Sequence, residues 1–215
     1  MTIENKAPGK DVSIEDLKSK FPLAAKNSPE HYSQFEIAGV KFGGGNIPVM
    51  AGPNMVESEE LIVNTAKAVK QHGAHFLRGG AFKPLTFPYR SDKYNETREL
   101  GLEWLMIAKK EAGIPIITEI MEEGYIDAVA EVADIMQIGT RNMQNFPLIS
   151  AVAKTGKPVM IKRHFGCSLR DWLGAAEYVL IEGNNKVILC ERGVSAPHTH
   201  RDSSRFLLDL QVIPA

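Results

Sequence analysis

The sequence predicts an α/β protein built on a (β/α)8 barrel, with about six βα units in this chain. Short apolar segments alternate regularly with segments of helical periodicity, and this alternation is typical of parallel α/β folds. Nearly every apolar segment ends in a side chain that can bind or react, as in barrels, whose strand ends meet at one mouth. A doubly wound sheet is the alternative, but no G-x-G-x-x-G motif follows the first strand. The barrel is therefore favoured.

The predicted strands are apolar over almost their whole length, as expected for strands that are covered on both faces. They span residues 47–52, 75–80, 114–120, 134–139, 158–163 and 187–192. The predicted helices span residues 58–71, 99–112, 122–132, 146–155 and 168–182, and a last helix is expected from about residue 203. We expect Ser58 to cap the first of these helices, and Gly156 and Gly183 to end two others.

Three regions are expected along the chain. Residues 1–34 form a polar N-terminal extension with a short helix near residues 14–21, and residues 35–46 form a hairpin that closes the barrel bottom. Residues 47–215 form the barrel. Because a closed barrel of this type has eight strands, strands seven and eight are expected to be absent from this chain.

Composition excludes several classes of function. The chain has 215 residues and a formal net charge of −1 without a run of Lys and Arg, so it offers no general attraction to nucleic acid. No apolar run approaches the roughly 20 residues that cross a bilayer, and the first residues do not resemble a secretory signal. Cys167 and Cys190 have no metal-ligand spacing and are predicted to be free, buried thiols. We expect a cytoplasmic protein without nucleic-acid or membrane partners.

Cationic side chains recur at the predicted strand ends of this nearly neutral protein. They are Arg78, Lys83, Arg141, Lys162, Arg163 and Arg192. Scattered surface charge is the alternative, but cations at the tips of buried apolar strands are costly unless they are paired. Guanidinium groups bind phosphate or carboxylate through two hydrogen bonds, and lysine adds a point charge. The pattern predicts a site for a doubly anionic substrate such as a phosphorylated carboxylate.

Four segments carry a family resemblance. LRGGAFKP (77–84), QIGTRNMQN (137–145), VMIKR (159–163) and VILCERG (187–193) occur in this order. They closely resemble the 3-deoxy-D-arabino-heptulosonate 7-phosphate (DAHP) synthase family, in the form related to 3-deoxy-octulosonate 8-phosphate synthases. The resemblance implies a barrel enzyme, a homodimer or homotetramer, that condenses phosphoenolpyruvate with a sugar-phosphate aldehyde and releases phosphate. For a DAHP synthase the aldehyde is erythrose 4-phosphate, in the first step of the shikimate pathway.

The resemblance also implies roles for individual residues. The phosphoenolpyruvate site would comprise Arg78, Lys83, Arg141, Lys162 and Arg192. Arg141 and Arg192 would hold the phosphate, while Lys162 would meet the carboxylate and relay a proton. Lys83 would donate to the aldehyde oxygen, and Glu119 and Gln137 would line the reacting carbons. Lys83, Lys162 and Glu119 are thus the expected catalytic residues, and Thr86 is a further substrate-binding residue.

The sequence departs from the family pattern at three places. Asn54 stands where metal-binding members have a cysteine ligand, so a divalent metal is doubtful and no cofactor is assigned. Leu85 replaces the arginine that would hold the phosphate of erythrose 4-phosphate, which leaves the identity of the aldehyde open. His164 and Phe165 follow the fifth strand in place of smaller residues. His164 is either a packed loop residue or a general acid or base.

Further alternatives remain open. The histidines His198 and His200 lack a nearby third metal ligand, and His200 or Arg201 would compensate for the arginine that is lost at Leu85. The acceptor is the aldehyde of a 3-deoxy-octulosonate 8-phosphate synthase, or another one. A Schiff-base aldolase with Lys162 as nucleophile is a different enzyme class. A catalytically inactive homologue that binds phosphoenolpyruvate is the non-enzymatic alternative.

Overall fold

The computed structural model describes residues 14–83, 96–195 and 207–210. Its centre is a parallel six-stranded sheet in which the spatial order of the strands equals their order in the chain. The strands are β3 (Met50–Ala51), β4 (Phe76–Arg78), β5 (Ile116–Ile120), β6 (Ile135–Ile138), β7 (Val159–Lys162) and β8 (Val187–Cys190). All six predicted strands are confirmed, each within shorter bounds than predicted. A sheet in which every strand lies beside its sequence neighbours is the arrangement of a (β/α)8 barrel.

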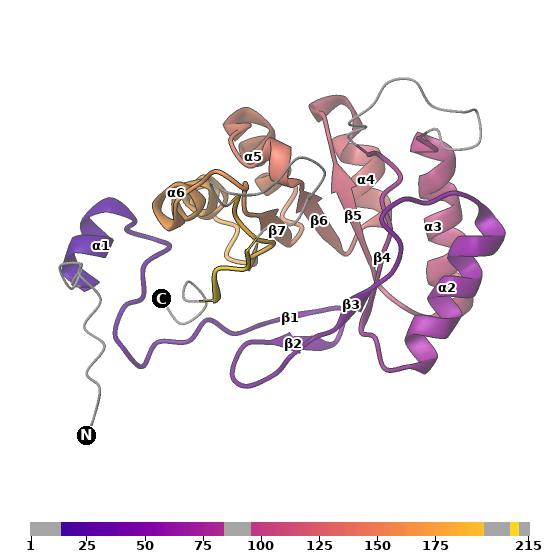
Figure 1. Ribbon diagram of the computed structural model, residues 1–215, viewed down its shortest axis with the longest axis horizontal. Helices are drawn as coiled ribbons and strands as arrows, with labels where there is room; N and C mark the ends of the chain where they lie inside the picture. Colours follow the sequence, from indigo (N-terminus) through magenta and orange to yellow (C-terminus); the bar gives the residue numbers. More distant parts are fainter. Residues whose placement is uncertain (1–13, 84–95, 196–206, 211–215) are drawn as a thin grey trace.

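Helices follow one another around the outside of this sheet (Figure 1). They are α2 (Glu59–Gln71), α3 (Arg98–Ala112), α4 (Ile126–Val132), α5 (Phe146–Ala153) and α6 (Leu169–Leu180), with α1 (Ile14–Lys20) before the sheet. The short 3-10 helices η2 (Glu123–Tyr125) and η3 (Thr140–Asn142) follow β5 and β6. The helix predicted from about residue 203 begins outside the described residues. Within the described ranges, no helix is both long and apolar enough to cross a membrane.

Local sequence signals set the helix boundaries. The Ser58 side chain accepts a hydrogen bond from the Leu61 amide at 3.3 Å, as predicted for the cap of α2. Gly156 and Gly183, which follow α5 and α6, have φ angles of 71° and 81°. Glycine adopts this left-handed conformation without steric cost, and the two helices end at Ala153 and Leu180, two residues before their predicted ends.

The apolar core lies on both faces of the sheet. The larger part fills the space between the sheet and helices α2 to α6. The smaller part lies on the inner face, where Ile37 and Phe42 pack with the strand residues. These two residues come from an antiparallel hairpin of β1 (Phe35–Ile37) and β2 (Val40–Phe42). The hairpin therefore covers the inner face from one side, and the Phe42 and Phe76 ring centroids lie 5.7 Å apart.

Inner side chains of the sheet form two layers, because alternate residues of a strand point to the same face. The layer nearer the amino ends is apolar and comprises Phe76, Ile117, Ile135, Met160 and Ile188. Two positions later, each of these five strands carries a polar or ionisable side chain. These residues are Arg78, Glu119, Gln137, Lys162 and Cys190, and we refer to them as the polar layer. Strand alternation thus places a layer of polar and ionisable side chains next to a layer of apolar ones, on the carboxyl-end side.

Candidate active site

The polar layer lies at the carboxyl ends of β4 to β8, where barrel proteins carry their active sites. Strand pairing places Glu119 directly beside Gln137, and Lys162 directly beside Cys190. The structure therefore brings together residues that are far apart in the sequence.

Glu119 and Gln137 form a buried pair in the polar layer. The Gln137 amide Nε2 donates a hydrogen bond to Glu119 Oε2 at 2.8 Å, and the two residues are only 2% and 8% exposed, respectively. Burial raises the pKa of the Glu119 carboxyl, although Lys162, Arg78, Lys83 and the hydrogen bond from Gln137 oppose this change. The result is a carboxyl group that holds its proton more tightly than an exposed glutamate does.

Arg78 is held by the turn that follows β3. Its Nη1 donates to the Pro53 carbonyl at 3.1 Å and to Asn54 Oδ1 at 3.2 Å. Burial lowers the pKa of Arg78, and the charges of Glu119 and Cys190 oppose the change. Asn54 therefore serves here as an acceptor for a cation. An uncharged amide whose oxygen already faces a guanidinium is a poor ligand for a divalent metal, so this position does not fit one.

Lys162 is half-buried among charged groups from several neighbouring elements. Burial lowers the pKa of its ammonium group, and the charges of Arg78 and Arg192 lower it further. Glu119 and Cys190 act in the opposite direction. The Lys162 amine consequently loses its proton more readily than an exposed lysine does, which suits a group that moves protons.

Cys190 belongs to the polar layer, although sequence analysis predicts only an ordinary buried thiol. The residue is half-buried, and burial raises the pKa of the thiol, while Lys162 on the adjacent strand opposes the change. The sequence contains a signal that predicts this position. Cys190 follows Ile188 by two residues, and residues i and i+2 of a strand point to the same face of the sheet. The thiol thus forms part of the site wall.

The remaining predicted cations lie at the same end of the sheet. Lys83 is half-buried, its backbone amide donates to Glu96 Oε1 at 2.9 Å, and its charge acts on Glu119. The Arg192 guanidinium lies 5.8 Å from the centre of the Phe165 ring, and its charge acts on Lys162. Arg141 is exposed on η3, just beyond the end of β6. The structure thus groups Arg78, Lys83 and Lys162 around Glu119, with Arg192 acting on Lys162 and Arg141 exposed beyond the end of β6.

Arg163 was predicted to belong to this cationic group, and that prediction is wrong. Its side chain points to the outer face of the sheet, where it is 4% exposed. Its Nη1 lies 2.8 Å from Glu191 Oε2 and 3.0 Å from Asp209 Oδ2, and its guanidinium lies 5.8 Å from the Trp172 ring centre. Two consecutive residues of a strand face opposite ways, so Lys162 and Arg163 cannot share one site. Arg163 closes a structural ion-pair network instead.

His164 has the contacts of a packed loop residue. Its Nδ1 accepts a hydrogen bond from the Gly166 amide at 3.1 Å, and its ring centroid lies 4.3 Å from that of Phe165. Five further residues from the sequence analysis lie outside the described residues. One is a departure from the family pattern, and the others are candidate substrate or metal ligands. They are Leu85, Thr86, His198, His200 and Arg201.

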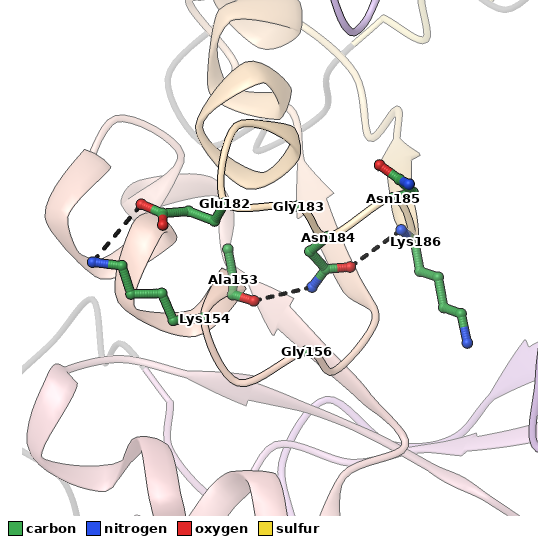
Figure 2. A pocket seen from close by; sticks show the side chains of 8 residues that line it. All are labelled: Ala153, Lys154, Gly156, Glu182, Gly183, Asn184, Asn185 and Lys186. Atoms are coloured by element: carbon green, nitrogen blue, oxygen red, sulfur yellow. Dashed lines mark hydrogen bonds and ion pairs between the residues drawn. The ribbon is translucent and has the colours of Figure 1, made fainter.

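A hollow lies at the opposite, amino end of β7 and β8 (Figure 2). It has a volume of about 310 Å³ and is lined by Ala153, Lys154, Gly156, Glu182, Gly183, Asn184, Asn185 and Lys186. Asn184, 7% exposed, donates to the carbonyls of Ala153 and Lys157 at 3.3 and 2.7 Å and accepts from the Lys186 amide. The side-chain amide of Asn184 is therefore fully engaged with backbone groups, which indicates that this residue has a structural role and links neighbouring segments of the chain.

The fold is that of the (β/α)8 barrel class, with ionisable groups at the end of the sheet where such proteins react with their substrates. Comparison with known proteins agrees and is more specific. A model of the DAHP synthetase I family matches residues 20–214. The chain belongs to this family.

Individual relatives give the same result. The chain is 37% identical over 202 residues to phospho-2-dehydro-3-deoxyheptonate aldolase from Thermotoga maritima, covering 94% of this chain and 58% of that protein. It is 37% identical over 154 residues to 2-dehydro-3-deoxyphosphooctonate aldolase from Pisum sativum, covering 67% of this chain and 51% of that protein. The crystal structure of the DAHP synthase from T. maritima matches with a TM-score of 0.76 at 40% identity, covering 85% of this chain and 51% of that chain. The chain spans about half the length of these relatives.

Proposed function

We propose that the protein condenses phosphoenolpyruvate with a sugar-phosphate aldehyde and releases inorganic phosphate, as a DAHP synthase does. The observation that carries the proposal is the group of cations that surrounds the buried pair of Glu119 and Gln137. Phosphoenolpyruvate is a small molecule with a carboxylate and a phosphate, and clustered cations in a partly dehydrated site bind such anions strongly. The names of the two relatives, both aldolases of 2-dehydro-3-deoxy sugar acids, support the same reaction.

The reaction needs charge stabilisation at two points. C3 of phosphoenolpyruvate forms a bond to the aldehyde carbon, and the aldehyde oxygen takes up a proton. Water then adds at C2, and the bond from C2 to the phosphate oxygen breaks. Negative charge develops on the aldehyde oxygen and on the departing phosphate, where fixed cations lower the barrier.

Each residue of the site has a role in this proposal. Lys162 binds the carboxylate and relays a proton, since burial and the charge of Arg78 lower the pKa of its ammonium group. Lys83 donates the proton to the aldehyde oxygen, while Arg141 and Arg192 hold the phosphate. Glu119 keeps the neighbouring cations in place, and Arg78 is held toward the substrate by the Asn54 turn.

Carbon counting defines the choice of acceptor. Phosphoenolpyruvate supplies three carbons, so a heptonate product needs a four-carbon aldehyde and an octonate product needs a five-carbon one. The T. maritima relative, named for the heptonate, is matched over more of this chain than the P. sativum relative. We therefore propose erythrose 4-phosphate as the acceptor, with a five-carbon sugar phosphate as the second candidate.

Phosphate release by the natural full-length protein tests the proposal. Phosphoenolpyruvate is supplied with a panel of phosphorylated aldoses of four and five carbons, with and without EDTA. We expect release with erythrose 4-phosphate, and activity that survives EDTA because Asn54 is a weak metal ligand. No release with any aldehyde, despite binding of phosphoenolpyruvate, would indicate an inactive homologue. Borohydride trapping of substrate on Lys162 would indicate a Schiff-base aldolase instead.

A further inference from the structure

Gly139 lies beside the candidate active site, and a side chain at this position would collide with the carboxylate of Glu119. It follows β6 and is the next inward position after Gln137, since Ile138 lies in the outer core. A Cβ atom built on Gly139 would lie 2.6 Å from the Glu119 carboxyl carbon and closer still to Glu119 Oε1. Its three nearest heavy atoms all belong to that carboxylate. The carboxylate of Glu119 therefore occupies the space that any other residue at position 139 would fill.

Backbone conformation does not explain this glycine. Gly139 has φ −67° and ψ 159°, which is an extended conformation that every residue adopts without strain. Gly52 is different, because its φ is 147° and a Cβ there would lie 3.0 Å from the Arg78 carbonyl carbon. At Gly52 the neighbour is rigid backbone, whereas at Gly139 the neighbour is the end of a side chain that can rotate. A methyl group at position 139 would thus move the carboxylate and leave the sheet intact.

We propose that Gly139 is a positioning residue, whose missing side chain leaves the space that fixes the Glu119 carboxylate among the cations of the polar layer. The carboxylate accepts a hydrogen bond from Gln137 at 2.8 Å, and Glu119 is only 8% exposed, so the carboxylate is held in its present position by Gln137 and by the surrounding residues. Displacement would break this hydrogen bond and remove negative charge from the neighbourhood of Arg78 and Lys162. The inference deepens the proposed function, because both Glu119 and Lys162 belong to its site.

The protonation of Lys162 reports where the carboxylate lies. The groups that act on Lys162 are Glu119 of β5, Arg78 of β4, Cys190 of β8 and Arg192, which follows β8. Of these, Glu119 carries the negative charge that raises the pKa of Lys162, together with Cys190. If the carboxylate moves away, the ammonium group loses that stabilisation and faces the repulsion of the two arginines. The pKa of Lys162 then falls further.

Competitive labelling of the full chain with acetic anhydride over a pH series measures this effect. Mass spectrometry of the peptide that carries Lys162 gives the pH midpoint of its reactivity. In Gly139→Ala we expect the midpoint to fall by about one pH unit, with the protein still folded by circular dichroism. Gly124→Ala is the matched control, because Gly124 has no atom within 4 Å of an added Cβ and no left-handed φ. Its midpoint stays at the wild-type value.

A rescue variant locates the clash in the carboxylate. Aspartate is one methylene shorter than glutamate, so Glu119→Asp combined with Gly139→Ala makes room for the new methyl group. We expect the Lys162 midpoint of this double variant to lie between that of Gly139→Ala and that of wild type. An unchanged midpoint in folded Gly139→Ala would overturn the inference, as would a double variant no better than the single one. If Gly139→Ala does not fold, a folded double variant supports the inference and an unfolded one contradicts it.

Phosphoenolpyruvate is not needed for this experiment, so the two proposals fail separately. A shifted Lys162 midpoint in a protein that binds no phosphoenolpyruvate would contradict the proposed function alone. Binding of phosphoenolpyruvate with an unshifted midpoint would contradict the role of Gly139 alone.

Discussion

The two ends of the sheet both carry polar side chains, but these side chains meet different partners. At the amino ends, Asn184 bonds to backbone groups of three residues and joins neighbouring segments. At the carboxyl ends, Glu119 and Lys162 face other ionisable side chains. Burial raises the pKa of Glu119 and lowers the pKa of Lys162, so it favours the neutral form of each. Buried groups that are satisfied by backbone stabilise a fold, whereas perturbed ionisable groups cluster at functional sites. The comparison teaches that the partners of a polar group distinguish a structural joint from a binding site.

Arg163 gives the largest expected effect, because it lies at the carboxyl end of β7 but faces outward. Changing Arg163→Met leaves Glu191 and Asp209 without their shared cation in a buried network. We expect the free energy of unfolding to fall by about 3–5 kcal/mol, measured by urea denaturation. The exposed Arg170→Met is the control and should change it by about 0.5 kcal/mol or less. A loss as small as that of the control would show that Arg163 is not a structural residue.

Lys162 gives the next largest effect, on binding rather than on stability. Changing Lys162→Ala should weaken the affinity for phosphoenolpyruvate by a factor of about 100 or more in titration calorimetry. Its thermal stability should not decrease, since the burial cost and the repulsion by Arg78 disappear with the charge. Lys186→Ala, in the hollow at the amino ends, is the matched control and should bind normally. Equal affinity in the two variants would remove Lys162 from the site.

Asn184 tests the other half of the comparison. Changing Asn184→Ala leaves buried backbone groups without partners and should lower the free energy of unfolding by about 2 kcal/mol. Affinity for phosphoenolpyruvate should be unchanged in the folded variant. The exposed neighbour gives the control, Asn185→Ala, which should be close to wild type in both measurements. Weaker binding by Asn184→Ala at full stability would mean that the hollow takes part in the site.

Glu119 gives the smallest effect, seen in the pH dependence of stability. The folded protein holds the Glu119 proton more tightly than the unfolded chain does. Stability is therefore lost as pH rises from the ordinary glutamate pKa to the raised folded value. Glu119→Gln removes this loss, so its melting temperature should exceed that of wild type at neutral pH and match it in acid. Exposed Glu122→Gln is the control. Parallel melting curves for wild type and Glu119→Gln across the pH series would contradict the buried carboxyl.

The six strands and the cations at their ends could be predicted because both follow from local patterns. Apolar runs predict the strands, and parallel strand ends meet at one edge of a sheet. The pattern did not decide which of Lys162 and Arg163 faces inward. That choice depends on Glu191 and Asp209, which are 28 and 46 residues away from Arg163 in the sequence. Long-range partners of this kind are not visible in a single strand.

The contribution of Gly139 shows a second limit of sequence reasoning. A glycine after a strand is usually read as a turn residue, and its ordinary φ and ψ become known only from the structure. The overlap of its empty side-chain position with the Glu119 carboxylate joins two different strands. Cys190 was missed for a simpler reason, since counting two residues on from Ile188 would have placed it beside Lys162.

The opposite orientation of Lys162 and Arg163 has a consequence for how the gene can change. Inserting or deleting one codon within β7 would exchange the two side chains, sending the inner lysine outward and the outer arginine inward. Such a change would remove Lys162 from the binding site and Arg163 from its ion pairs at the same time. No single second mutation would restore both binding and stability. Length variation among descendants of this sequence should therefore accumulate in the connecting segments, while the number of residues in β7 stays constant.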